Sequence, residues 1–89
     1  MIVPFSVNGW TAMTPLQPPH FDAVTCLTVL NDILVSGSKD KNLRVYNSVA
    51  PFEPVNSVMN AHSDQINCLE NDGSFVYSGS RDGIVKVWK

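Results

Sequence analysis

The 89-residue chain has no long apolar run and little charge. Its unbroken hydrophobic stretches are far shorter than the roughly 20 residues that a membrane helix needs, and only 16% of its residues are charged. A net charge of −2 is not that of a basic nucleic-acid-binding protein. The first residues, Met1 to Phe5, carry no charged segment of the kind that opens a secretory signal. These absences predict a soluble cytoplasmic protein with no membrane partner and no direct nucleic-acid partner.

Cysteine and glycine are also sparse. Cys26 and Cys68 are too few for a disulfide scaffold and lack the neighbours of a zinc site, so we expect both to be reduced and buried. Gly37 and Gly79 each stand alone among strand-forming residues, which excludes a glycine-rich phosphate loop around them. The sequence thus predicts no cofactor.

The C-terminal part of the chain has the pattern of a β-hairpin. Two short runs, Phe75–Ser78 and Ile84–Trp88, are rich in β-branched and aromatic residues, and Asp82 and Gly83 lie between them. An Asp-Gly pair between two such runs is a strong hairpin signal. Because polar side chains are spaced along this hairpin, it holds either a reactive site or a structural one.

The same pattern occurs once more, 42 residues earlier. Sliding the sequence by 42 positions aligns two 28-residue segments without a gap, and nine of those 28 positions are identical. The aligned polar and aromatic pairs are His20 and His62, Ser36 and Ser78, Asp40 and Asp82, and Tyr46 and Trp88. A period in the forties, built from short strands with no helical pattern, is typical of a β-propeller in which each repeat supplies one four-stranded blade.

The sequence therefore predicts an all-β fold made of propeller blades. The expected strands span residues 24–29, 33–36, 43–46, 55–59, 66–69, 75–78 and 84–88. The expected divisions are an N-terminal segment over 1–19 with a possible outer strand in 2–7 or 10–14, repeat 1 over 20–61, and repeat 2 over 62–89. We expect repeat 2 to lack its final outer strand.

These residues resemble the WD40 repeat family. The ordered set of a histidine, Ser-Gly-Ser-x-Asp and Val-Trp runs from His62 to Trp88, and it runs again from His20 to Tyr46 with tyrosine in place of tryptophan. The resemblance covers about three quarters of the chain. It implies two tandem blades of an incomplete propeller and a non-catalytic scaffold that binds other proteins.

The resemblance also implies a structural tetrad of hydrogen-bonded side chains in each repeat. In repeat 2 the indole N–H of Trp88 would donate to Ser78, whose hydroxyl would donate to His62. The other ring nitrogen of His62 would donate to Asp82. In repeat 1 the corresponding residues are His20, Ser36, Asp40 and Tyr46. A phenol O–H lies at a different distance from the backbone than an indole N–H. We therefore expect that Tyr46 does not complete the same chain of hydrogen bonds and that repeat 1 is held less tightly than repeat 2.

Two reactive interpretations compete with this structural one. Ser78, His62 and Asp82 have the residue types of a hydrolytic triad, but Ser78 lies in an expected strand without a G-x-S-x-G elbow, and the whole set is duplicated. The two His-x-Asp sequences, at 20–22 and 62–64, could be metal ligands, yet each offers only two. We therefore expect no catalytic residue and no metal.

Recognition of partner proteins by surface loops is the function that remains. The resemblance places partner contacts on the loops around the propeller channel, beside the tetrad positions. The candidate partner-binding residues are Phe21, Lys39, Lys41, Ser63, Gln65 and Arg81. Phe21 either anchors an interface or packs against Pro18 and Pro19. The charges within residues 39–44 are mixed in sign and are expected to form a solvated hairpin tip.

Two blades are too few for a stable propeller. Propellers close with about four to eight blades, and about three repeats are needed for a stable array. We therefore expect exposed apolar faces and unpaired strand edges. Further blades would have to be supplied in cis, by a larger protein of which this is a fragment, or in trans, by other copies or another chain.

A narrower resemblance is to the WD-repeat tail of kinesin-4-type microtubule motors. It rests on Pro-Pro-His at residues 18–20 and Asn-Ala-His at residues 60–62. It implies the cargo-binding or partner-binding tail of a kinesin-like protein, associated with the cytoskeleton, with any motor activity elsewhere. The alternative is a substrate-recruiting adaptor of the ubiquitin-ligase or signalling type, and a serine hydrolase is the remote one.

Overall fold

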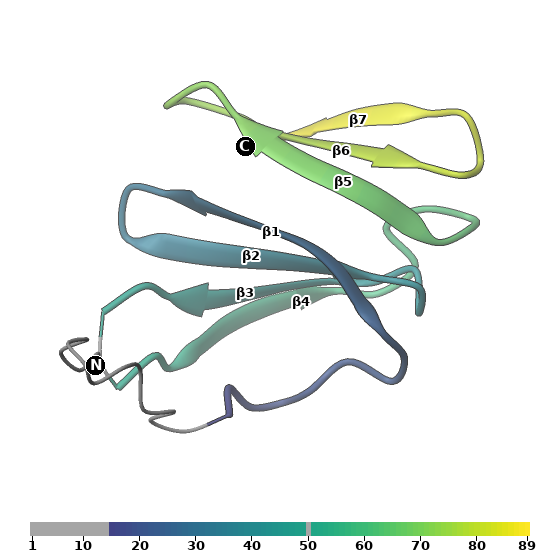
Figure 1. Cartoon of the computed structure of the whole chain (residues 1–89). Helices are drawn as coiled ribbons and strands as arrows, with labels where there is room; N and C mark the ends of the chain where they lie inside the picture. Colours follow the sequence, from purple (N-terminus) through teal and green to yellow (C-terminus); the bar gives the residue numbers. More distant parts are fainter. Residues whose placement is uncertain (1–14, 50) are drawn as a thin grey trace, which may run out of the picture.

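In the computed structural model, which describes residues 15–49 and 51–89, the chain forms seven β-strands in two antiparallel sheets (Figure 1). Sheet 1 contains, in spatial order, β1 (Val24–Leu30), β2 (Ile33–Ser38), β3 (Leu43–Asn47) and β4 (Pro54–Val58). Sheet 2 contains β5 (Ile66–Asn71), β6 (Val76–Ser80) and β7 (Val85–Trp88). Every neighbouring pair is consecutive in sequence, which is the meander of a propeller blade. The all-β prediction is confirmed, and the possible strands at 2–7 and 10–14 lie outside the described residues.

Two strands of sheet 2, β6 and β7, begin one residue later than the sequence predicts. Phe75 was assigned to a strand, but its backbone N–H donates to Asp72 Oδ1 at 2.9 Å and so belongs to the turn after β5. Ile84 was assigned to the last strand, but its N–H donates to Asp82 Oδ1 at 2.8 Å. In both places an aspartate side chain binds a backbone group that a strand would otherwise use.

The β6–β7 turn is longer than the two-residue loop that an Asp-Gly pair suggests. The N–H of Gly83 donates to the Ser80 carbonyl at 3.1 Å, and Gly83 alone in this turn has a positive φ, of 85°. The equivalent turn in repeat 1 has the same bond, from Lys41 to Ser38 at 3.2 Å, and Lys41 has a φ of 75°. One left-handed residue after the turn is the pattern of a three-residue hairpin loop, and repeat 1 fills that position with a lysine.

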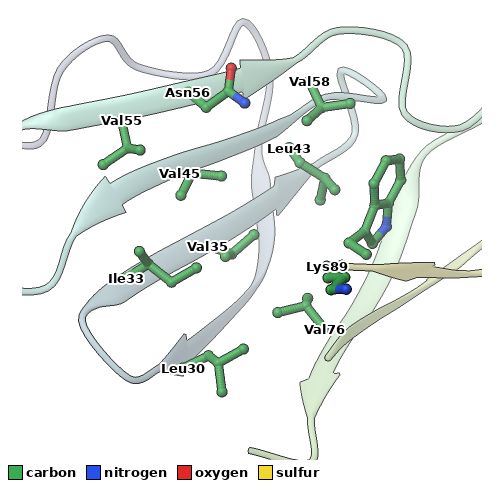
Figure 2. A pocket seen from close by; sticks show the side chains of 11 residues that line it. Leu30, Ile33, Val35, Leu43, Val45, Val55, Asn56, Val58, Val76 and Lys89 are labelled. Carbon is green, nitrogen blue, oxygen red and sulfur yellow. The ribbon is translucent and has the colours of Figure 1, made fainter. Parts of the chain in front are cut away.

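The two sheets meet through β5, which packs against β1 and β2, and they separate toward their other strands (Figure 1). The space between the separated strands is a pocket of about 240 Å³ (Figure 2). Its walls are mostly apolar side chains of sheet 1 together with the end of sheet 2: Leu30, Ile33, Val35, Leu43, Val45, Val55, Asn56, Val58, Val76, Trp88 and Lys89. The inter-sheet core is therefore packed at β5 and open at the outer strands.

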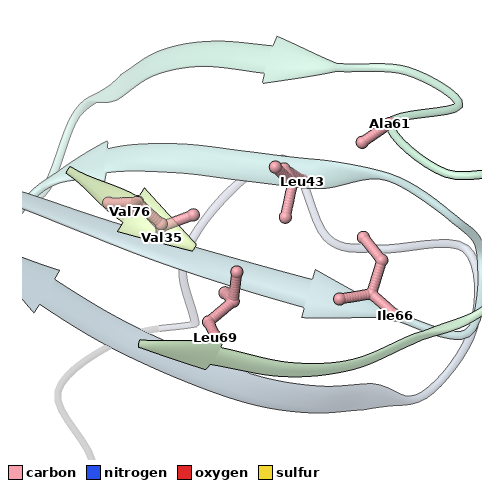
Figure 3. Packing of buried hydrophobic residues seen from close by; sticks show 6 residues of the cluster. All are labelled: Val35, Leu43, Ala61, Ile66, Leu69 and Val76. Carbon is pink, nitrogen blue, oxygen red and sulfur yellow. The ribbon is translucent and has the colours of Figure 1, made fainter. Parts of the chain in front are cut away.

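The core forms where β5 lies against sheet 1. Its buried members come from both sheets and from the loop before β5 (Figure 3): Val35, Leu43, Ala61, Ile66, Leu69 and Val76. Ile66 is fully buried and packs over Gly37 of β2, where an added Cβ would lie 2.8 Å from the Ile66 Cγ2. Burial of a side chain of this size stabilises the fold by roughly 2 kcal/mol. Glycine at position 37 thus allows the two sheets to approach.

The outer face of each sheet carries exposed apolar side chains. Leu27 in sheet 1 and Val85 and Val87 in sheet 2 are all more than half exposed. Cys68 is exposed as well, so the prediction that both cysteines are buried is wrong for Cys68, and Cys26 is only half-buried. The two cysteines differ because of what packs beside them. Ile66 of the other sheet packs over Gly37 next to the Cys26 sulfur, whereas no other side chain of the described residues packs over Gly79 next to the Cys68 sulfur. No helix in the described part of the chain is long and apolar enough to cross a membrane.

Candidate interaction site and its polar braces

A chain of four side chains joins the strands of repeat 2. Trp88 Nε1 donates to Ser78 Oγ at 2.8 Å, and Ser78 Oγ lies 2.7 Å from His62 Nε2. His62 Nδ1 lies 3.0 Å from Asp82 Oδ2. Since an indole N–H can only donate, the Ser78 hydroxyl donates to Nε2, and the His62 tautomer carries its proton on Nδ1 and donates to Asp82. We call these four residues the repeat 2 brace.

In repeat 1, three of the four side chains form the same arrangement. His20 Nε2 lies 2.7 Å from Ser36 Oγ, and His20 Nδ1 lies 2.9 Å from Asp40 Oδ2. Tyr46 does not reach Ser36; its hydroxyl donates to the carbonyl of Pro18 at 2.8 Å. Tyr46 is buried, so its O–H is satisfied by the N-terminal segment instead of by the repeat's own serine.

The two aspartates tie these braces to the loops. Asp40 accepts from the backbone N–H of Phe21 at 2.8 Å and of Asn42 at 2.9 Å. Asp82 accepts in the same way from Ser63 at 3.1 Å and from Ile84 at 2.8 Å. Each aspartate therefore joins the loop that follows a histidine to a hairpin turn.

These hydrogen bonds set the acidity of the aspartates. Partial burial of Asp82 raises its pKa, but the bonds from the Ile84 N–H, from His62 and from the Ser63 N–H outweigh it and bring the pKa down to about 2. For Asp40, burial again raises the pKa, and the bonds from backbone N–H groups and His20 lower it further than burial raises it. Both carboxylates are stabilised in their charged form.

The buried serines are placed for bracing rather than for attack on a substrate. Ser78 is 0% exposed and Ser36 is 4% exposed, so neither hydroxyl offers a substrate carbonyl an approach. Both ring nitrogens of His62 already have partners within the protein. Asp22 and Asp64 do not meet the histidines as ligands but accept from the N–H of the residues that follow them. No group of three potential metal-binding side chains occurs within the described residues.

The loops before β1 and β5 and the turns that join β2 to β3 and β6 to β7 lie at one end of both sheets (Figure 1). We call this end the loop edge; it consists of residues 20–23, 39–42, 59–65 and 81–84. Backbone bonds connect its segments: from Lys39 to the Ala23 carbonyl at 3.0 Å, from His62 to the Lys41 carbonyl at 3.5 Å and from Arg81 to the Gln65 carbonyl at 3.1 Å. The third bond repeats the first, and the second spans the two sheets. The loop edge is thus one connected surface.

The predicted partner-binding residues all lie on the loop edge. Phe21, Lys39, Lys41, Ser63 and Arg81 are exposed, and Gln65 is half-buried. Phe21 is 77% exposed, and its ring centroid lies 5.3 Å from the Arg44 guanidinium carbon, within cation–π distance. The expectation of a solvated tip over residues 39–44 is wrong for Arg44, which is 5% exposed because Phe21 and Ser57 lie against its guanidinium.

Sequence reasoning missed the polar contacts between the sheets. Asn71 Nδ2 donates to Thr28 Oγ1 and to the Val29 carbonyl, both at 2.8 Å. Thr25 Oγ1 donates to the Ile66 carbonyl. No sequence signal could have found them, because Asn71 aligns with Val29 and Thr25 with Asn67 in the 42-residue repeat. They are contacts of one blade with its neighbour, and a single-repeat motif does not contain them.

Two stacked antiparallel blades, each with a His-Ser-Asp brace and a shared loop edge, define a repeat protein of the propeller class. The family model of the WD domain, G-beta repeat, matches residues 13–47 and 52–89, which is most of the chain. The chain belongs to the WD40 repeat family, whose members are generally non-catalytic modules for protein interaction.

The chain is similar to small parts of much longer proteins. It is 36% identical over 74 residues to the kinesin-like protein KIF21A of Homo sapiens, which covers 81% of this chain and 4% of that protein. It is 29% identical over 107 residues to the nuclear distribution protein PAC1 of Lachancea thermotolerans, covering 92% of this chain and 22% of PAC1. The computationally designed Ika4 protein has a similar structure, with a TM-score of 0.70 and 30% identity over 82% of this chain and 44% of Ika4.

Proposed function

We propose that the chain is the partner-binding part of a kinesin-like microtubule protein and that its loop edge carries the contact. The proposal is supported by one observation above all: an exposed aromatic and three exposed cations, Phe21, Lys39, Lys41 and Arg81, gather at the end of the blades where the braces hold the loops. The similarity to KIF21A supports the cytoskeletal setting and a cytoplasmic location.

Rigidity makes these loops suitable for recognition. The N–H of Phe21 is held by Asp40 and that of Ser63 by Asp82, and both aspartates are bound by a buried or half-buried histidine. A loop that is ordered before it binds loses less entropy on association than a mobile one. The braces therefore contribute to binding indirectly, by positioning their neighbours.

The loop edge carries three exposed cations, Lys39, Lys41 and Arg81, beside the exposed Asp22 and the half-buried Asp64, so an acidic partner would contact the cations locally. Asp40 and Asp82 are turned inward, where a histidine and backbone N–H groups hydrogen-bond their carboxylates. No ion pair with another described residue is formed by Lys39, Lys41 or Arg81. An exposed aromatic and an arginine are residue types that anchor interfaces, and exposed lysines around them speed association with an acidic partner.

Co-sedimentation of the 89-residue chain with polymerised tubulin tests the proposal. We expect the chain to pellet with microtubules and to be released as salt is raised, since exposed charge pairs are screened. Charge reversal of the three cations together, Lys39→Glu, Lys41→Glu and Arg81→Glu, should weaken binding by at least tenfold. The matched control is Lys89→Glu, which reverses a charge outside the loop edge and should leave binding unchanged.

Binding that is absent, or that survives the triple charge reversal at full strength, would overturn the proposal. Phe21→Ala adds a second readout that is independent of net charge. The ring is 77% exposed, so its removal uncovers Arg44 but should leave the strands folded while binding weakens. Circular dichroism of each variant shows that the fold is retained.

A further inference from the structure

A cation is hidden beneath the exposed ring of the loop edge. Arg44, the second residue of β3, is 5% exposed, whereas Phe21 is 77% exposed. The guanidinium carbon of Arg44 lies over the Phe21 ring, 5.3 Å from its centroid. Since the face of an aromatic ring attracts a cation within about 6 Å, Arg44 backs one side of the ring. Most of the rest of the ring is open to solvent.

Arg44 has few polar contacts apart from this ring. Its Nη1 donates to Ser57 Oγ at 2.8 Å. Its buried Nε has no hydrogen-bond partner, and no carboxylate among the described residues forms an ion pair with it. A buried charge without a partner costs free energy. The Phe21 ring and the Ser57 hydroxyl are therefore what the described residues offer this charge, and the ring and the guanidinium hold each other in place.

The pair departs from the repeat at both of its positions. Lys86 is aligned with Arg44, and its Nζ donates to the Ala61 carbonyl at 2.8 Å. Ser63 is aligned with Phe21, and its hydroxyl donates to the brace aspartate at 3.3 Å. Repeat 2 thus satisfies both side chains with its own polar groups, and its brace is complete without an aromatic–arginine pair. The pair in repeat 1 is therefore an addition to the brace and not a part of it.

Phe21 is held at its backbone as well as at its ring. Its N–H donates to Asp40 Oδ2 at 2.8 Å, and Arg44 lies against the ring. An aromatic side chain that is ordered before a partner arrives loses less entropy on association. A fixed and exposed aromatic is also the kind of residue that anchors an interface.

We infer that Arg44 is a positioning residue of the loop edge, which holds the Phe21 ring as the docking point for one apolar side chain of an acidic segment. The inference rests on the proposed partner contact and names the chemistry of that partner. The open side of the ring gains most from an apolar group, because burial removes apolar surface from water, and Arg44 beneath the ring repels a cation there. The exposed Lys39, Lys41 and Arg81 favour carboxylates beside it.

Nitrogen-15 NMR of the full 89-residue chain tests the contact without any partner. The chain has two arginines, Arg44 and Arg81, so two Nε–H signals are expected, and Arg81→Lys identifies the Arg44 signal. The ring current of Phe21 should shift the Arg44 signal upfield, and Phe21→Leu should move it back downfield. An Arg44 signal that is the same with and without the ring would overturn the inference.

Two synthetic peptides, Glu-Glu-Leu-Glu-Glu and Glu-Glu-Ala-Glu-Glu, test the docking point. We expect the leucine peptide to bind at least about fourfold more tightly, the factor that one buried CH₂ group contributes. Phe21→Ala and Arg44→Gln should each bind the two peptides equally, and Arg44→Lys should restore part of the preference. The matched control is Lys86→Gln at the aligned position of repeat 2, which should keep the preference for leucine.

Equal binding of the two peptides to the unaltered chain would overturn the inference, as would a full leucine preference in folded Arg44→Gln. Circular dichroism shows whether that variant is folded, and the NMR measurement does not depend on it. Neither measurement uses microtubules. A leucine preference without co-sedimentation would therefore overturn the tubulin partner alone, whereas co-sedimentation without a leucine preference would overturn the role of Arg44 alone.

Discussion

Trp88 donates its indole N–H to Ser78 Oγ at 2.8 Å, whereas Tyr46, the equivalent residue 42 positions earlier, donates to the carbonyl of Pro18 and not to Ser36. The two repeats therefore share a His-Ser-Asp core but differ in the fourth member. Repeat 2 closes its brace within the blade. Repeat 1 uses its aromatic hydroxyl to hold the segment that precedes the first histidine.

Exchange of the two aromatic residues should have unequal effects. Trp88→Tyr removes the N–H donor from Ser78 and should destabilise the fold by about 1 kcal/mol, the net value of one buried hydrogen bond. Tyr46→Trp loses the bond to Pro18 but offers Ser36 a donor, so its net effect should be smaller. Urea unfolding monitored by circular dichroism measures both. Equal losses in the two variants would contradict the assignment of different roles.

The two equivalent glycines should differ in their tolerance of alanine. A Cβ at Gly37 would lie 2.8 Å from both the Cys26 sulfur and the Ile66 Cγ2, inside the packed inter-sheet core. A Cβ at Gly79 would meet only the sulfur of Cys68, which is exposed and free to turn. We expect Gly37→Ala to cost about 1–3 kcal/mol by overpacking and Gly79→Ala to cost clearly less. Thermal melts of the pair would detect the reverse order.

Lys41 offers a stabilising substitution. It has a φ of 75° at the turn position that repeat 2 fills with Gly83, at 85°. A side chain in this left-handed region costs roughly 1 kcal/mol, so Lys41→Gly should raise the free energy of unfolding by up to that amount. Gly83→Ala is the mirror experiment and should lower it similarly. If Lys41→Gly destabilises the protein, contacts of the lysine side chain outweigh its backbone strain.

Acid should weaken the fold through the aspartates of the braces. Asp82 has a pKa of about 2 in the folded chain and about 3.9 in an unfolded one. Because the folded value is the lower, the stabilisation is complete above about pH 4 and is lost as the pH falls toward 2. Asp82→Asn should therefore flatten the loss of stability between pH 4 and 2. An unchanged slope in acid denaturation would show that the His62–Asp82 pair does not contribute.

The sequence alone was sufficient for the strands and the fold class because the 42-residue repeat carries both. A brace residue such as His62 is recognisable by its spacing from Ser78, and the spacing follows from three short strands. Turn ends were less predictable, since the Asp72 and Asp82 side chains take backbone N–H groups away from β6 and β7. The partner-binding residues and the divisions between repeats stay predictions.

Contacts between blades could not be predicted from the repeat. Asn71 bonds to Thr28 and Val29 across the sheets, and its counterpart in repeat 1 is an apolar residue. Arg44 looked like a surface charge in sequence, but Phe21 and Ser57 cover it. Each of these facts depends on which side of a strand faces a neighbour, and that is settled by the packing of one blade on the next.

The most direct test of the brace as a structural element is a double-mutant cycle of Ser78→Ala and Trp88→Phe, measured by urea unfolding. If the two side chains stabilise the fold through their 2.8 Å hydrogen bond, the cycle should give a coupling free energy of about 0.5–1.5 kcal/mol. Additive losses, with a coupling free energy near zero, would contradict the account.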